Sequence, residues 1–297
     1  MTRQSDATPG LEERPMQSNN PVFRSQAFQS YAGNGSAHQG YGQTGHSDPS
    51  TWGVGTPGGP AGPSAPVATT PITIDSVVQK TAISLVAVLA AAAVTWLATP
   101  DITDTDADLG PLIGLMTIGS LVAFGLSMVN SFKRVVSPAL VVLFAVAQGV
   151  ALGGLSKFFD AMIGDHIVVQ AVIGTFAAFA GTLAAYKFFD IQVGNKFRTF
   201  VIAAMFGMVG LSLLELVLGL FGAQLGLFGM GGLGLVFAIG GLVLGVFMLI
   251  LDFDIAEQLI AHGAPDREAW RVAFGLTVSL VWIYTNLLRI LAILNQD

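Results

Sequence analysis

The densest group of acidic side chains, Asp252, Asp254 and Glu257, follows directly after a long apolar run. Carboxylate oxygens are the ligands that calcium and other hard cations prefer, so this group could bind or steer a cation. On a helix, residues two apart point about 200° apart, whereas residues three apart share a face. Asp252 and Asp254 therefore cannot both face one partner, and we predict that Asp254 and Glu257 share a face. The alternative is that the helix is simply leaving the membrane here.

Three further polar residues interrupt other apolar runs. Glu215 lies near the middle of one run, where an ionised side chain costs about 2.5–3.5 kcal/mol on insertion scales. Glu215 is therefore expected either to be protonated or to line a wet cavity. Asn130 and Gln148 stay neutral, and we expect both to bridge helices by hydrogen bonds.

The last apolar run also carries polar side chains, including Ser279, Asn286 and Arg289. Asn286 and Arg289 are three residues apart and therefore share a helix face. A polar face predicts that this helix lies inside the bundle, surrounded by the other six spans, so that its polar groups contact protein and not lipid.

These residues lie within a chain dominated by seven apolar stretches, each about 20 residues long, which is the length of helix that crosses a bilayer. The runs are apolar on every face and lack the alternation of barrel strands, so we predict an all-α, seven-helix transmembrane bundle. Small-residue pairs such as Gly149/Gly153 and Gly241/Gly245 predict close helix packing. The expected spans are 77–97, 111–132, 138–158, 167–188, 200–222, 233–251 and 272–294.

Composition supports a membrane protein and excludes several other classes. Hydrophobic residues make up 53% of the chain and charged residues 11%, against about 25% charged in ordinary soluble domains. No basic stripe supports nucleic-acid binding, and the absence of cysteine excludes disulfides and thiolate metal sites. No cofactor is indicated, and the identity of any bound metal stays open. Because all four histidines lie outside the spans, we expect no enzyme active site; they are His38, His46, His166 and His262.

Residues 1–72 differ from the rest, with Gly, Ser, Pro and Gln dominating. Such a segment cannot bury enough apolar surface to offset its ordering entropy, so we predict a disordered cytoplasmic tail, followed by a transmembrane domain over residues 73–297. With the tail inside, 11 of the 13 basic residues lie on the cytoplasmic side, as positively charged loops normally do. Seven spans then place the C-terminus outside. The predicted location of the protein is the plasma membrane of the cell.

Three motifs resemble the Bax inhibitor family of membrane proteins, including its bacterial YccA-type members and most of all actinobacterial ones. The first motif lies at the third span and consists of Ser137-Pro138-Ala139-Leu140 followed by AQGVALGGLS over residues 147–156. Leu251-Asp252-Phe253 closes the sixth span, and residues 286–294 (NLLRILAIL) close the seventh. The resemblance covers residues 76–294.

The resemblance implies a seven-helix bundle with the last helix central and a pH-sensitive calcium leak. In that family the leak is governed by two aspartates that share a proton, one ending the sixth helix and one in the seventh. Asp252 corresponds to the first aspartate, whereas Ser279 stands at the position of the second. Gln148 stands where many members carry a glutamate. Calcium, if conducted, is expected to meet Asp252, Asp254 and Glu257, with Glu215 as a further carboxylate.

Two functions follow as hypotheses from different classes. The first is an ion-leak protein of the bilayer, gated at the cytoplasmic end of the sixth span. The second is a non-transporting regulator that binds a membrane protease or another membrane protein complex through its tail or cytoplasmic loops. Neither hypothesis sets an oligomeric state.

Overall fold

The computed structural model describes residues 70–102, 109–164 and 166–296. These residues form seven long helices, which confirms the predicted all-α fold, so the sixth and seventh predicted spans are α7 and α8 below. The predicted tail lies outside the described residues except for residues 70–72. The elements are α2 (Ile74–Ala98), α3 (Gly110–Phe132), α4 (Pro138–Ile163), α5 (Ile167–Phe188), α6 (Asn195–Leu220), α7 (Gly232–Ala261), the 3₁₀ helix η3 (Asp266–Glu268) and α8 (Ala269–Leu294).

Local sequence explains where several helices begin. The Thr73 side chain accepts a hydrogen bond from the backbone of Ser76, and the Ser76 hydroxyl accepts one from the Thr73 N–H, which together form a capping box. Pro111 and Pro138 lie in the first turns of α3 and α4, where a backbone N–H has no helical partner to lose. All seven helices are long and apolar enough to cross a membrane.

Two helices extend further than the apolar runs predict. α7 has 30 residues and is therefore about 45 Å long, which exceeds the roughly 30 Å hydrocarbon core of a bilayer. Its acidic residues consequently stay helical instead of entering a loop. α6 begins at Asn195, five residues before the expected start, so Glu215 lies in the last third of its helix. The prediction that Glu215 lies near the middle was wrong, because the helix starts among polar residues.

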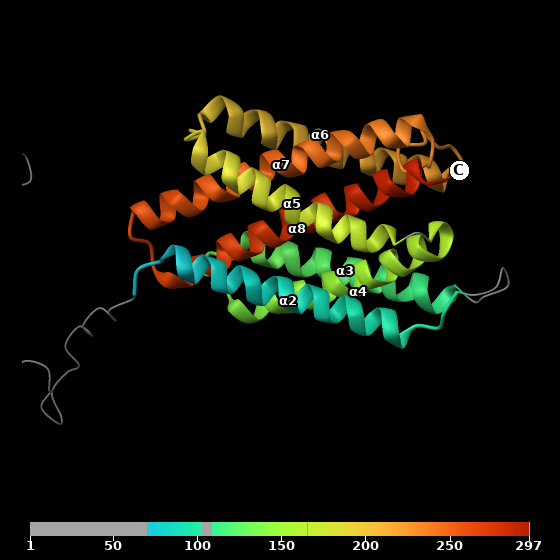
Figure 1. Cartoon of the computed structure of the whole chain (residues 1–297), viewed down its shortest axis with the longest axis horizontal. Coiled ribbons are helices and arrows are strands. Elements are labelled where there is room, and N and C mark those ends of the chain that lie inside the picture. The colour runs from blue at the N-terminus through green and yellow to red at the C-terminus, as the bar shows by residue number, and fades with distance from the viewer. Residues whose placement is uncertain (1–69, 103–108, 165, 297) are drawn as a thin grey trace, which may run out of the picture. The chain divides into compact units, whose positions relative to one another are not determined.

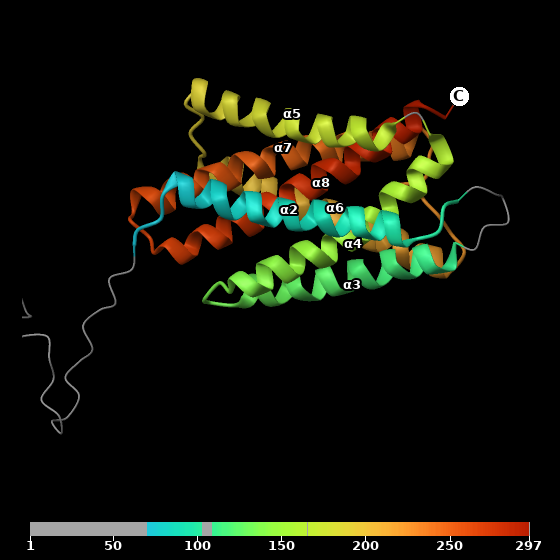
Figure 2. The ribbon, with the colours of Figure 1, turned by 60° about the horizontal axis from the view of Figure 1, so that its bottom comes forward.

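α8 is the central helix of the bundle. It packs against α7, α2, α5 and α4, whereas α3 packs chiefly on α4 and α6 chiefly on α7. Figures 1 and 2 show α8 between α7 on one side and the α3/α4 pair on the other. The expectation that all six other spans surround α8 is thus met by four of them. Its polar residues Thr277, Ser279 and Asn286 are buried against protein.

Glycines allow the closest helix contacts, as the small-residue pairs predict. A Cβ added at Gly149 or Gly153 would collide with backbone carbonyls of α2. On α7, a Cβ at Gly241 would collide with the Asn286 side chain, and one at Gly245 would lie 2.6 Å from Ile283 of α8. The α2/α4 and α7/α8 interfaces therefore depend on these missing side chains.

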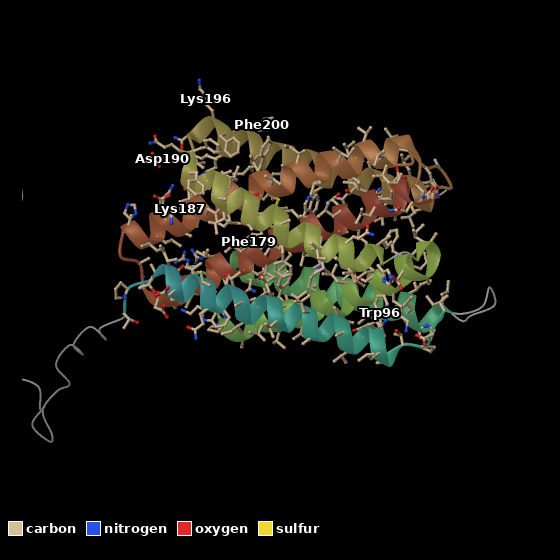
Figure 3. The ribbon with its side chains drawn as sticks, in the orientation of Figure 1. Trp96, Phe179, Lys187, Asp190, Lys196 and Phe200 are labelled. Carbon is tan, nitrogen blue, oxygen red and sulfur yellow. The ribbon has the colours of Figure 1, made fainter. Side chains whose placement is uncertain are left out.

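Charge separates the two ends of the bundle. The end at which α2 begins, here called the basic end, carries eight of the ten described Lys and Arg residues; Figure 3 shows Lys187 and Lys196 there and Trp96 toward the other end. Lys157 and Arg289 lie toward the opposite end. The basic-end residues are Lys80, Lys133, Arg134, Lys187, Lys196, Arg198, Arg267 and Arg271.

At the basic end, the segment that precedes α2 is bound to the loop between α7 and α8. The Ile72 N–H donates to the Ala264 carbonyl at 2.8 Å, and the Asp266 N–H donates to the Thr70 carbonyl at 2.8 Å. Lys80 adds an ion pair of 2.6 Å with Asp266. Ile72 is buried, so this segment, which the sequence assigned to the tail, belongs to the packed bundle.

Candidate functional site

The acidic group of α7 does not form one cluster, because its three carboxylates face three different helices. The Asp252 carboxylate accepts a hydrogen bond from Ser279 of α8 at 2.5 Å. Asp254 forms an ion pair of 2.8 Å with Arg198 of α6. Glu257 accepts a hydrogen bond of 2.7 Å from the hydroxyl of Tyr186 on α5.

Asp252 lies in a recess on the central helix. Ser279 donates its hydroxyl hydrogen to Asp252, and Gly275, one turn earlier on α8, leaves space for the carboxylate. A Cβ at Gly275 would lie 2.7 Å from Oδ1 of Asp252. Sequence reasoning missed Gly275, although the small residues at 275 and 279, four apart, are the pattern that admits a close neighbour. We call Asp252, Gly275 and Ser279 together the Asp252 contact.

Asp254 and Glu257 tie α7 to its other neighbours. Asp254 is buried, and Gln258 donates a second hydrogen bond of 2.9 Å to it beside Arg198. Glu257 is exposed at the basic end, where Tyr186 holds it. The predicted common face of Asp254 and Glu257 is therefore divided between α6 and α5. The described residues contain no group of three His, Cys, Asp or Glu side chains placed to hold a metal ion.

A cavity of about 670 Å³, apolar over most of its wall, lies between α3, α4, α6, α7 and α8. Gln148 of α4 lines it together with Thr285, Asn286 and Arg289 of α8. Serines at 120, 127 and 212 add hydroxyl groups to its wall. Among its lining residues Arg289 is the only charged one. The cavity extends from Arg289 to Val278, the residue that precedes Ser279 along α8.

Arg289 and Asn286 hold the structure around this cavity. The Arg289 guanidinium donates to the Leu227 carbonyl at 2.7 Å and lies 5.2 Å from the centre of the Phe228 ring. It thereby fixes the loop between α6 and α7. Asn286 donates to the Trp282 carbonyl of its own helix at 2.8 Å and packs against Gly241.

The remaining predicted site residues lie away from the Asp252 contact. The Glu215 carboxylate accepts hydrogen bonds from the backbone N–H groups of Leu225 (2.9 Å) and Gly226 (3.0 Å). It therefore fixes the α6–α7 loop, which Arg289 also binds. Asn130 is buried in the last turn of α3, and its side-chain amide has no hydrogen-bond partner among the described residues. The predicted bridging hydrogen bond of Asn130 is thus not present in that part of the chain.

The fold and site define a polytopic helical membrane protein whose central helix carries a serine against an aspartate of its neighbour. The pattern of the family described as Bax inhibitor 1 like matches residues 20–296, nearly the whole chain. The chain belongs to this family, as its motifs predict. A comparison with curated proteins gave no match.

Proposed function

We propose that the protein is a cation leak of the membrane, with Asp252 as the carboxylate that a permeating cation meets. The observation that carries this proposal is the position of Asp252, held by Ser279 against the central helix. A carboxylate inside a helical bundle is costly and commonly serves an ion pathway. The other two carboxylates of the α7 group are engaged by Arg198 and Tyr186, which leaves Asp252 as the one that faces α8.

The proposed pathway joins the cavity lined by Gln148 and Arg289 to the Asp252 contact. We place a small apolar cluster on this pathway: in it Phe144 of α4 and Phe274 of α8 meet edge to face at 4.9 Å, and Phe274 precedes Gly275 of the Asp252 contact. Val278 belongs to this cluster and also lines the cavity. Apolar constrictions of this kind close pores by excluding water. The bundle described here therefore corresponds to the closed state.

The distribution of charge along this pathway favours the selection of cations at Asp252. The cavity itself offers hydroxyl and amide groups and one guanidinium, which attract no cation strongly. Its amide Gln148 stands where many relatives carry a carboxylate, so the negative charge is confined to the Asp252 end. The many Lys and Arg residues of the basic end support a cytoplasmic position for that end. Calcium would leave or enter the cytoplasm past Asp252.

The serine at position 279 changes how pH acts on such a leak. Two carboxylates held together share a proton and titrate as a pair. Ser279 has no titratable proton in this range, so pH acts through the charge of Asp252 alone. A leak in this protein should therefore follow a single protonation step and not the coupled titration of a pair.

Calcium flux into proteoliposomes loaded with a calcium-sensitive dye tests the proposal. The wild-type protein should conduct calcium, and Asp252→Asn should lower the flux, since the charge that attracts the ion is removed. Asp190→Asn is the matched control, because it removes a carboxylate from the α5–α6 loop at the same end of the bundle. Absence of wild-type flux, or equal flux in wild type and Asp252→Asn, would refute the leak.

A regulator of membrane complexes is the second candidate function. The segment before α2 is bonded to the α7–α8 loop, so a partner that pulls on that segment would also move the loop. Crosslinked pulldowns with the full chain and with residues 1–66 removed test this. A partner that disappears with the truncation, while calcium flux persists, supports regulation; partners captured equally by both forms contradict it.

A further inference from the structure

A second cavity opens between α2 and α5 and shares one lining residue, Val281, with the first. Its volume is about 540 Å³, within the range of small-molecule sites, and α4 and α8 form its floor. α2 packs mainly on α4 and α8, and α5 packs mainly on α8 and α7. The two helices that frame the groove therefore rest on the same floor without forming a major contact with each other.

The groove is apolar over most of its length. Leu85, Leu89 and Ala93 of α2 face Val172 and Phe176 of α5 across it. Along α2 the lining runs from residue 85 to residue 97, which at 1.5 Å per residue is about 18 Å. One leaflet of the hydrocarbon core is about 15 Å thick, so the groove matches one extended acyl chain in length.

The end of the groove opposite the basic end is polar and offers hydrogen-bond acceptors. The hydroxyl oxygens of Ser156 and Tyr284 are 2.6 Å apart, and Ser156 also donates to the Leu152 carbonyl at 2.6 Å. Tyr284 therefore donates its hydrogen to Ser156 and keeps a lone pair for a further donor. Asp160 lies one turn beyond Ser156 on α4 and lines the same end.

The acidic and basic side chains that line this end are Asp160 and His166, and Asp160 supplies the negative charge. The Asp160 carboxylate makes no hydrogen bond or ion pair with any residue that the structure describes. The neighbouring Lys157 does not compensate it, because its ammonium donates to the carbonyls of Trp96 (2.9 Å) and Thr99 (2.6 Å) and pairs with Asp101 at 3.0 Å. An unpaired carboxylate beside a free lone pair suits a ligand group that carries N–H donors and a positive charge.

We propose that the groove binds one phospholipid with a primary ammonium headgroup. One acyl chain lies between α2 and α5, and the ammonium group donates to Asp160 and to the Tyr284 hydroxyl. Trp96 also lines the groove at this end, and we assign its indole N–H as a donor to the phosphate. A choline headgroup lacks N–H donors, and a glycerol headgroup leaves the lipid with a net negative charge facing Asp160. The site is distinct from the Asp252 contact, since α8 lines the groove with Leu280, Val281 and Tyr284 and holds Asp252 with Gly275 and Ser279.

Native mass spectrometry of the full-length protein tests the proposal, with phosphatidylethanolamine, phosphatidylcholine or phosphatidylglycerol of the same acyl chains added in detergent. The wild type should retain one phosphatidylethanolamine about fivefold more tightly than either other lipid, because a partly exposed charge pair contributes an affinity gain of about that size. Asp160→Asn should remove this preference while the acyl-dependent binding remains. Ala93→Trp should fill the groove and lower the retention of all three lipids.

Val94→Trp is the matched control for Ala93→Trp. Val94 is the next residue of α2, is 65% exposed and does not line the groove. It should bind lipid as the wild type does, and unchanged helicity and elution volume of each variant show that the bundle is intact. Equal retention of the three lipids by the wild type, a preference for phosphatidylglycerol, or equal effects of the two tryptophan variants would overturn the proposal.

Discussion

The Ser279→Ala variant gives the sharpest test of how the bundle is held closed. The substitution removes the hydroxyl that donates to Asp252 at 2.5 Å and leaves the helix backbone and the neighbouring Gly275 unchanged. A hydrogen bond to a charged group contributes about 1.5–3 kcal/mol. Since 1.4 kcal/mol corresponds to a factor of ten, the closed state should lose about 10- to 150-fold in population relative to the open state.

The expected result is a higher calcium flux in dye-loaded proteoliposomes, with wild type, Ser279→Ala and a control reconstituted at equal density. Thr277→Val is the control, because Thr277 is fully buried on the same helix but donates only to the Ala273 carbonyl of its own helix at 2.7 Å. The double variant with Asp252→Asn should conduct less than Ser279→Ala alone, because the carboxylate charge that attracts the cation is then missing.

Two results would contradict this account of the Asp252 contact. Flux that is unchanged or lower in Ser279→Ala means that the serine does not hold the bundle closed. An equal rise in Thr277→Val means that any disturbance of α8 opens the bundle, independent of Asp252.

Three further predictions concern packing and loops, and each is checked on purified protein in detergent. Gly149→Ala should destabilise the protein by about 1–3 kcal/mol in thermal unfolding, because the new Cβ overlaps the backbone of α2. Gly125→Ala is the control and should be neutral or slightly stabilising, because Gly125 has open space around it. Equal melting temperatures of the two variants would contradict the close packing at Gly149. Glu215→Ala should cost about 2–3 kcal/mol and speed hydrogen exchange of the α6–α7 loop amides that the carboxylate binds, while unchanged exchange would exclude this role. Lys80→Met should cost about 1 kcal/mol by removing the ion pair with Asp266, with a smaller effect at high salt, and a loss that does not depend on salt would assign it to packing instead.

The seven spans could be predicted because each carries its own signal. Runs of about 20 apolar residues leave the backbone no water to bond with, so in a bilayer the helix is the only conformation open to them. Gly149 and Gly153 on α4, and Gly241 and Gly245 on α7, likewise revealed which helix faces pack closely. Helix ends were less certain, as α7 shows, because a helix leaving the bilayer can continue in water as long as its polar residues find partners.

The site could be predicted only in part. The resemblance to the Bax inhibitor family implied that Asp252 and position 279 form a pair, and the structure has these two residues in contact. The partners of Asp254 and Glu257 could not be read in the same way, since Arg198 and Tyr186 lie about 55–70 residues away in the chain and no local pattern links them. The sequence predicts that Glu215 is either protonated or lines a wet cavity, but it does not predict that the carboxylate binds backbone N–H groups of a loop that begins only a few residues later.

The sequence by itself determined the membrane environment, the number of spans, the family and the residue types available for chemistry. These properties depend on composition, length and local order, which need no knowledge of distant neighbours. Only the tertiary structure decided that three nearby carboxylates face three different helices, that Gly275 makes room for Asp252, and that Asp160 lines the end of a groove without an ion-pair partner among the described residues. The direction of each side chain depends on how the helices rotate against one another, and that rotation is set by packing across the whole bundle.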